Sequence, residues 1–159
     1  MKFSKQQDIE APIDYVFKRA TDFRAFERQA LRRGIEIARV DDLGQDAVGL
    51  RWKAAFPYRG KRRDVDAELI QLDAPNQLLI QSESGGISAE FGVEFMPMSA
   101  NRTRVKIGLQ MLPKTLPARM LVQSLKFAKS SLDVRFARRV EQFGTELQER
   151  YHGTTGRGL

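Results

Sequence analysis

The spacing of apolar residues divides the chain into helical, alternating and again helical stretches. After a weakly patterned first strand at 2–10, apolar residues recur every three or four positions over 12–20 and 22–33, which predicts two short helices. From 35 to 111 apolar and polar residues alternate, which predicts six further strands. Over 118–151 the helical spacing returns and predicts one long helix.

The turns between the predicted strands fix which residues face one another. Gly85-Gly86 is typical of a two-residue hairpin turn, because such turns need positive φ angles. Counting outward from the turns places apolar side chains opposite apolar ones and acidic side chains opposite basic ones. The predicted partners are Ile80 with Phe91, Leu78 with Val93, Glu94 with Lys106, and Arg51 and Lys53 with the acidic run Asp64, Asp66 and Glu68.

These patterns predict an α+β fold in which a curved seven-stranded antiparallel sheet wraps around the C-terminal helix. A sheet with one apolar face must cover that face, and the terminal helix is the longest amphipathic element available. Two short helices after the first strand would close one end and leave a space inside. We expect one domain over 1–151 and a flexible tail over 152–159.

Composition narrows the setting in which the protein works. The 159 residues include no cysteine, so disulfides and thiolate metal sites are excluded. The N-terminus lacks an apolar signal region, and no stretch approaches the length of a membrane span, so we expect a cytoplasmic protein. The one histidine, His152, lies in the expected tail, and no nucleophile or phosphate-loop motif is present. We therefore expect no catalytic residue, metal or cofactor.

The inward-facing positions are the candidates for a binding site. Most of them must pack in the hydrophobic core, and apolar ligand pockets use the same kinds of side chain. The sequence therefore does not show which residues pack in the core and which line a cavity. As possible polar anchors we single out Arg63, for which a solvated arginine is the simpler interpretation, and Ser82. The predicted cavity-lining residues are Trp52, Phe56, Phe91, Met111, Leu121 and Leu125.

A net charge of +7 raises the question of an anionic partner. Arg59, Lys61 and Arg62 cluster beside Tyr58 at a predicted hairpin tip. Such a tip could touch an anionic membrane transiently. A basic surface module for an anionic membrane or for nucleic acid is therefore an alternative function, with nucleic acid the less expected partner, and solubility alone is the simpler explanation.

Two local motifs add a family resemblance. The segment Ile9-Glu10-Ala11-Pro12-Ile13-Asp14-Tyr15-Val16-Phe17, followed by Asp22-Phe23, resembles the opening of the START/Bet v 1-like superfamily, also called SRPBCC or polyketide cyclase/dehydrase-like. The order of elements resembles its helix-grip fold along nearly the whole chain. The resemblance implies a hydrophobic cavity for a lipid or other apolar small molecule. A cyclase- or dehydratase-like enzyme acting on a polyketide-type substrate is the alternative.

Overall fold

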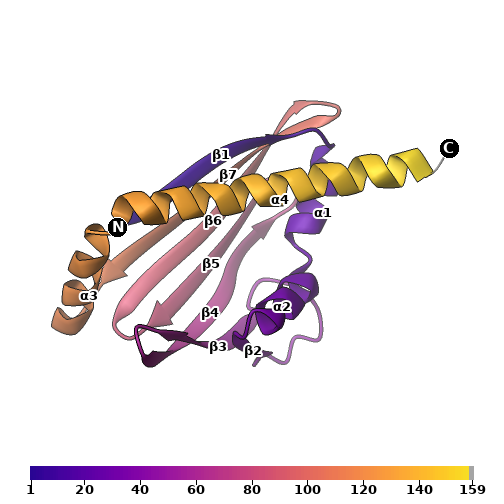
Figure 1. Ribbon diagram of the computed structural model, residues 1–159. Coiled ribbons are helices and arrows are strands. Elements are labelled where there is room, and N and C mark those ends of the chain that lie inside the picture. The colour runs from indigo at the N-terminus through magenta and orange to yellow at the C-terminus, as the bar shows by residue number, and fades with distance from the viewer. Residues whose placement is uncertain (158–159) are drawn as a thin grey trace.

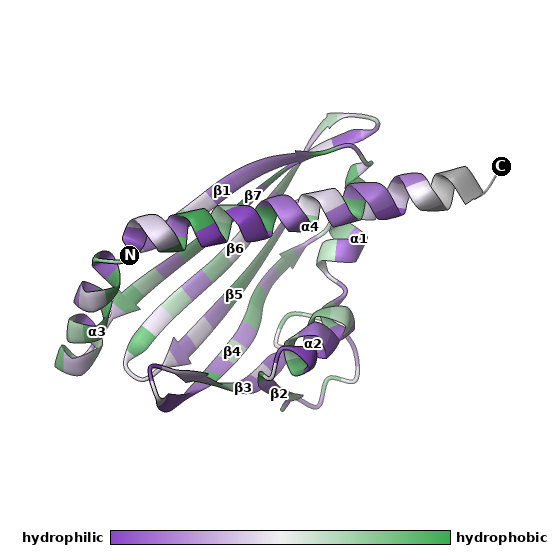
Figure 2. Ribbon diagram, viewed as in Figure 1, coloured by the Kyte–Doolittle hydropathy of each residue, from purple (hydrophilic) through white to green (hydrophobic). Residues whose placement is uncertain are grey.

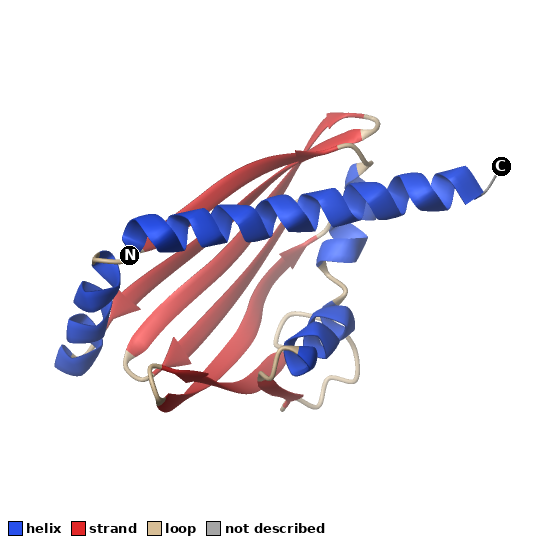
Figure 3. Cartoon of the chain, viewed as in Figure 1, coloured by secondary structure: helices blue, strands red, loops and turns tan. Residues whose placement is uncertain are grey.

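The structure is a computed structural model that describes residues 1–157, and it shows helices packed against one face of a curved sheet (Figures 1 and 3). The strands are β1 (Lys2–Ile9), β2 (Glu36–Arg39), β3 (Arg51–Tyr58), β4 (Lys61–Asp73), β5 (Gln77–Ser84), β6 (Ile87–Ser99) and β7 (Arg102–Pro113). The helices are α1 (Ile13–Ala20), α2 (Phe23–Arg32), α3 (Leu116–Lys126) and α4 (Lys129–Arg157).

Within residues 1–157 the seven strands form one antiparallel sheet in the order β1-β7-β6-β5-β4-β3-β2. The predicted facing pairs are confirmed at Ile80 with Phe91, Leu78 with Val93, and Glu94 with Lys106. Across β3 and β4, Arg51 faces Glu68 and Lys53 faces Asp66, also as predicted. A one-residue shift in register would exchange the two faces of a strand. These pairs therefore confirm that the sheet is apolar on its inner face and charged on its outer face. Figure 2 shows this alternation as green and purple bands along the strands.

The two short helices begin at the positions that their sequence signals indicate. Pro12 precedes α1 with a φ of −64°, the angle that its ring imposes. The Asp22 carboxylate accepts a hydrogen bond of 3.1 Å from the Ala25 N–H and so caps α2. Gly34, with a φ of +81°, follows the end of α2 in the left-handed conformation.

Helix α4 packs most closely on β1, at the edge of the sheet, and Gly144 makes that approach possible. A Cβ atom built on Gly144 would lie 3.0 Å from Gln7 Cγ and 3.4 Å from Ile9 Cγ1. Gly144 therefore marks a close contact between helix and strand rather than an exposed position. Helix α4 therefore follows one edge of the sheet, and α2 contacts β2 at the other edge (Figure 1).

The C-terminal helical region differs from the single helix predicted over 118–151. The chain turns at Phe127 and Ala128, so α3 and α4 point in different directions (Figure 1). The reason is tertiary, because α3 buries Ala118, Val122 and Leu125 at one end of the sheet while α4 follows β1. Helix α4 continues to Arg157, past the expected helix end at Tyr151, and residues 158–159 of the expected tail lie outside the described part of the chain. Within the described residues, no helix is long and apolar enough to span a membrane.

On the outer face, an ion pair joins the edge strand to its neighbour and should make stability pH-dependent. Asp8 Oδ1 accepts a hydrogen bond of 2.8 Å from Arg104 Nε. This bond, with the charges of Arg104 and Arg102, holds the pKa of the Asp8 carboxyl below its usual value. The native state therefore favours the ionised carboxylate, and the resulting stability is present above the unfolded-state pKa and lost as pH falls through the folded-state pKa.

We expect Asp8→Asn to cost under about 1 kcal/mol near neutral pH, because the pair is partly solvated. The difference from wild type should vanish at acid pH, below the folded-state pKa of Asp8. Urea unfolding across that range would measure it, with the exposed Asp66→Asn as a control. Parallel stability curves for wild type and Asp8→Asn would contradict this assignment.

Candidate functional site

A cavity of about 500 Å³ lies between the concave face of the sheet and helices α2 and α4. This volume falls within the usual range for small-molecule pockets, about 300–1,000 Å³. Its sheet wall is formed by Ile37, Trp52, Ala54, Ala67, Leu78, Ile80, Phe91, Val93 and Ile107. Its helical wall is formed by Ala20, Phe23, Phe26, Glu27, Ala30, Phe136, Arg139, Val140 and Phe143.

The space exists because small side chains occupy central positions of the wall. Ala54 lies opposite Val65 on β4 and Ile37 on β2, and Ala67 lies opposite Trp52. Neighbouring inward positions carry large side chains, so each alanine leaves a hollow in the wall. Ala20 and Ala30 do the same on the helical side.

Aromatic rings bound the cavity at two places. Trp52 is 7% exposed and meets the Phe23 ring edge-on, with centroids 5.5 Å apart. Phe26 on α2 and Phe143 on α4 lie with ring centroids 6.3 Å apart. Both of these residues also line a second hollow outside the α2–α4 contact, so the two rings stand between the two hollows.

The outer hollow, of about 370 Å³, is much more polar than the cavity. Arg139 lines both hollows, so one cationic side chain reaches from the surface to the apolar interior. The charged residues that line the outer hollow are Arg19, Asp22, Arg33, Arg139, Glu146 and Arg150.

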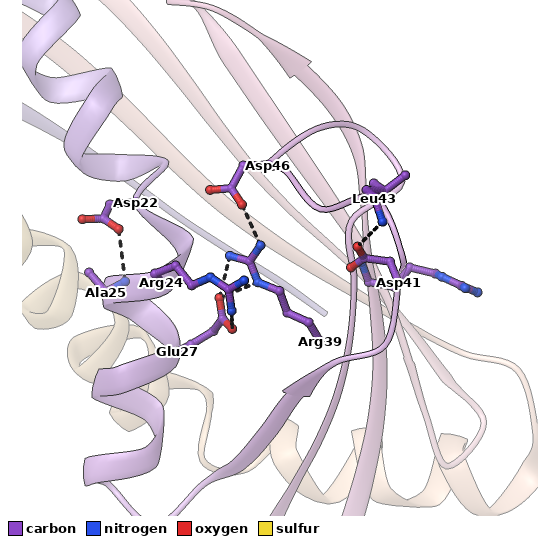
Figure 4. Close-up of polar contacts among 9 residues, drawn as sticks. Asp22, Arg24, Ala25, Glu27, Arg39, Asp41, Leu43 and Asp46 are labelled. Carbon is purple, nitrogen blue, oxygen red and sulfur yellow. Dashed lines mark hydrogen bonds and ion pairs between the residues drawn. The ribbon is translucent and has the colours of Figure 1, made fainter.

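Glu27 is the acidic residue in the cavity wall, and it is held by Arg39 (Figure 4). Arg39 projects from the inward side of β2. Its Nη2 atom lies 2.8 Å from Glu27 Oε2, and its Nε donates a hydrogen bond of 2.9 Å to the same oxygen. Both side chains are nearly buried, at 12% and 13% exposure. Arg39 Nη1 also contacts Asp46 at 2.7 Å, and hydrogen bonding to Glu27 and then to Asp46 raises the pKa of Arg39.

This cluster connects α2, β2 and the loop that follows β2. The loop is shaped locally by Asp41, whose carboxylate accepts hydrogen bonds from the N–H groups of Leu43 and Arg51. Figure 4 shows Arg39 between Glu27 on one side and Asp46 on the other. The cluster therefore fixes α2 over the cavity, and it holds the Glu27 carboxylate beside an apolar space.

Of the predicted lining residues, the structure places Trp52 and Phe91 on the cavity wall. Phe56 and Met111 lie on the inward face of β3 and β7 but are not among the residues that line this cavity. Leu121 and Leu125 belong to α3, which turns away from α4 and covers another end of the sheet (Figure 1). The break after α3 removes both of them from the wall that a continuous helix would have formed. That this wall binds a ligand stays a prediction.

The two predicted polar anchors also lie away from the cavity wall. Arg63 faces inward opposite Phe56, and its guanidinium lies 6.0 Å from the centroid of the Tyr58 ring. Its buried Nε has no hydrogen-bond partner among the described residues. The Ser82 hydroxyl lies 3.5 Å from the Ala89 carbonyl oxygen, on the neighbouring strand.

Sequence reasoning missed the polar members of the wall, Glu27 and Arg139, and the ion-pair partner Arg39. A signal for Arg39 was present, because it follows Ile35 and Ile37 at alternate positions and so shares their inward face. Phe136, Val140 and Phe143 belong to the apolar stripe of the terminal helix, but the stripe alone does not show which of its members face empty space. Within the described residues, no three His, Asp or Glu side chains gather where they could hold a metal ion.

Comparison with known proteins adds evidence at the level of fold. No protein-family model and no curated protein sequence matches the chain. Among solved structures, a protein of Thermus thermophilus is 20% identical, with a TM-score of 0.65 and coverage of 97% of this chain and 99% of its own.

Two enzymes are similar in the same way. A point mutant of norcoclaurine synthase from Thalictrum flavum, in complex with a transition-state analogue, is 14% identical, with a TM-score of 0.64 and coverage of 94% of this chain and 95% of its own. The Zhui aromatase/cyclase from Streptomyces sp. R1128 is 12% identical, with a TM-score of 0.64 and coverage of 94% of both chains. At these identities the likeness shows that this chain shares the helix-grip fold of Bet v 1-type proteins.

Proposed function

We infer that the chain belongs to the START/Bet v 1-like superfamily, and we propose that it binds a hydrophobic small molecule or lipid in the cavity between its sheet and α4. The observation that carries this proposal is the cavity of about 500 Å³, whose lining is apolar except for Glu27 and Arg139. Apolar pockets with a few polar groups are the usual form of small-molecule sites, since the apolar wall supplies affinity and the polar groups supply orientation. The shared helix-grip fold supports it at the level of architecture.

The position of the charges indicates how a ligand would lie. The apolar body of the ligand would occupy the space beside Ala54 and Ala67, at the centre of the sheet wall. A polar end would lie near Arg139, which connects the cavity to the outer hollow. The Phe26 and Phe143 rings would lie beside that polar end, because they line both spaces.

The protein contains its own reporter of binding. Trp52 is the one tryptophan of the chain, and it lies on the cavity wall. A neutral apolar fluorophore such as N-phenyl-1-naphthylamine should quench its emission and receive its excitation energy when it occupies the cavity. Native mass spectrometry after exposure to lipid extract would then identify compounds that the protein retains.

A cavity-filling substitution provides the decisive variant. Ala54→Phe should weaken binding of the fluorophore at least about tenfold, because the added ring occupies the volume that the ligand needs. Circular dichroism and thermal unfolding should stay close to wild type, since the ring enters empty space. Ala38→Phe is the matched control, because Ala38 lies on the adjacent strand, opposite Lys53 on the outer face. Equal binding by Ala54→Phe and wild type would reject this cavity as the site.

A cyclase- or dehydratase-like reaction is the second candidate, and Glu27 is the observation that favours it. A carboxylate beside an apolar space can act as a general base or acid toward a bound polyketide-type substrate. Its close pairing with Arg39 equally suits a structural role. The mass spectrometry described above separates the two functions, since an enzyme converts the compound that it retains and a binding protein releases it unchanged.

A further inference from the structure

Helix α3 is apolar on two opposite faces, and only one of them packs on the protein. The inner face buries Ala118, Val122 and Leu125. The outer face carries Leu116, Met120 and Phe127, whose exposures are 69%, 67% and 95%. At about 100° per residue these three lie within about 40° of one another around the helix axis. Gln123 lies between Met120 and Phe127 along the helix, at one side of this row. We call this row the α3 stripe.

The α3 stripe is too exposed to contribute to the fold. Phe127 is the C-cap of α3 and keeps helical backbone angles, φ −67° and ψ −25°, so its ring continues the row formed by Leu116 and Met120. A large apolar patch facing water usually marks an interaction surface. Figure 2 shows green segments along α3 at the end of the molecule away from α2.

The charged side chains of α3 itself are all positive. Arg119 and Lys126 lie along one side of it, and within the described residues neither side chain forms an ion pair. The sequence contains no Asp or Glu between Glu94 and Asp133, so no acidic side chain from α3 itself offsets them. An apolar row flanked by basic residues is the pattern of helices that lie in the interface of an anionic bilayer.

A second basic segment joins the same surface. Arg59, at the tip between β3 and β4, donates a hydrogen bond of 2.7 Å from Nη1 to Ser124 Oγ on α3. This contact places the hairpin tip, with Tyr58 and Lys61, beside the helix. Arg62 contributes less than its sequence position suggests, because Glu36 and Asp64 pair with its guanidinium.

We propose that α3 is a membrane-docking helix that inserts Leu116, Met120 and Phe127 into the surface of an anionic phospholipid bilayer while Arg119, Lys126, Arg59 and Lys61 contact the headgroups. The surface is separate from the cavity wall, to which α3 contributes no residue. Membrane binding can therefore be tested without knowing what the cavity holds, and its failure would leave the cavity proposal intact.

Co-sedimentation with vesicles tests the proposal. Wild type should sediment with vesicles of phosphatidylglycerol and phosphatidylcholine in equal parts, and far less with phosphatidylcholine alone. Added salt should weaken that binding, because the headgroup contacts are ionic. Changing Leu116, Met120 and Phe127 together to glutamine should weaken it at least about tenfold, since the apolar insertion is lost. The matched control is Met96→Gln with Met98→Gln, which removes two exposed methionines of β6 that lie near the start of β7, at the end of the strand away from α3.

A fluorescent variant reports the insertion directly. Phe127→Trp should shift its emission to the blue on the mixed vesicles, whereas the buried Trp52 adds a constant background. Failure of wild type to sediment with the anionic vesicles, or unchanged binding by the triple glutamine variant, would overturn the proposal. So would a wild-type dimer that the triple variant converts to a monomer in analytical ultracentrifugation, because the α3 stripe would then cover a second copy of the chain.

Discussion

Replacing Gly144 with leucine is expected to lower the free energy of unfolding by about 3 kcal/mol, at the upper end of what overpacking a core usually costs. Even a Cβ atom at this position would approach Gln7 Cγ to 3.0 Å and Ile9 Cγ1 to 3.4 Å. Ile9 is completely buried, so it has no free space into which to move. The remaining atoms of the leucine side chain would force α4 away from β1.

The same helix supplies the control for this prediction. Gly153→Leu introduces the same atoms where a Cβ meets nothing within 4 Å. It should leave stability unchanged or slightly raised, since leucine favours a helix more than glycine does. Urea unfolding followed by Trp52 emission measures both variants. A Gly144→Leu protein as stable as wild type would show that α4 is not held against β1 at this point.

The sheet was largely predictable from the sequence, because two independent constraints agree on it. Alternation assigns each side chain to a face, and the Gly85-Gly86 turn sets the offset between β5 and β6. The charged pairs on the outer face then follow by counting, as Glu94 and Lys106 illustrate. Periodicity and turn chemistry depend on a few neighbouring residues, so they can be recognised in a single sequence.

The break between α3 and α4 was not predictable in this way. Phe127 and Ala128 interrupt the helix, yet neither glycine nor proline marks the place. The apolar residues before and after it keep helical spacing, so the pattern is that of one continuous helix. What separates the two helices is the direction in which each finds apolar surface to cover, and that depends on the whole sheet.

The cavity was predictable as a consequence of the architecture but not residue by residue. The cavity exists where small side chains leave space between larger ones. Nothing in the sequence around Ala54 and Ala67 shows whether that space is empty or filled by a neighbouring side chain. Trp52 and Phe91 reach the wall because they occupy central inward positions. The pairing of Glu27 with Arg39 depends on how α2 folds back over β2, which single-sequence periodicity does not describe.

Replacing Arg39 with methionine is expected to lower the free energy of unfolding by about 2 kcal/mol, somewhat less than breaking a fully buried ion pair. Both members of the pair are almost enclosed, at 12% and 13% exposure, so Glu27 would be left charged beside the apolar cavity without its main partner. Asp46 would lose a contact as well, but its side chain is 40% exposed and can return to water.

Arg24→Met is the matched control for this change. Arg24 also pairs with Glu27, at 3.4 Å, but its side chain is 63% exposed. Its loss should cost under about 0.5 kcal/mol, since exposed ion pairs contribute little. Urea unfolding of the two arginine variants therefore compares a nearly buried partner with a solvated partner of the same carboxylate.

The double variant Glu27→Leu with Arg39→Met decides what the pair is for. If the cost of Arg39→Met comes from an unpaired carboxylate, removing the carboxylate should recover most of the lost stability. The cavity wall would then be charged only at Arg139, and an apolar fluorophore should bind at least as tightly as in wild type. A double variant less stable than Arg39→Met alone would instead mean that Glu27 stabilises α2 independently of Arg39. In that outcome the attachment of α2 over the cavity would rest on the helix itself rather than on its link to β2.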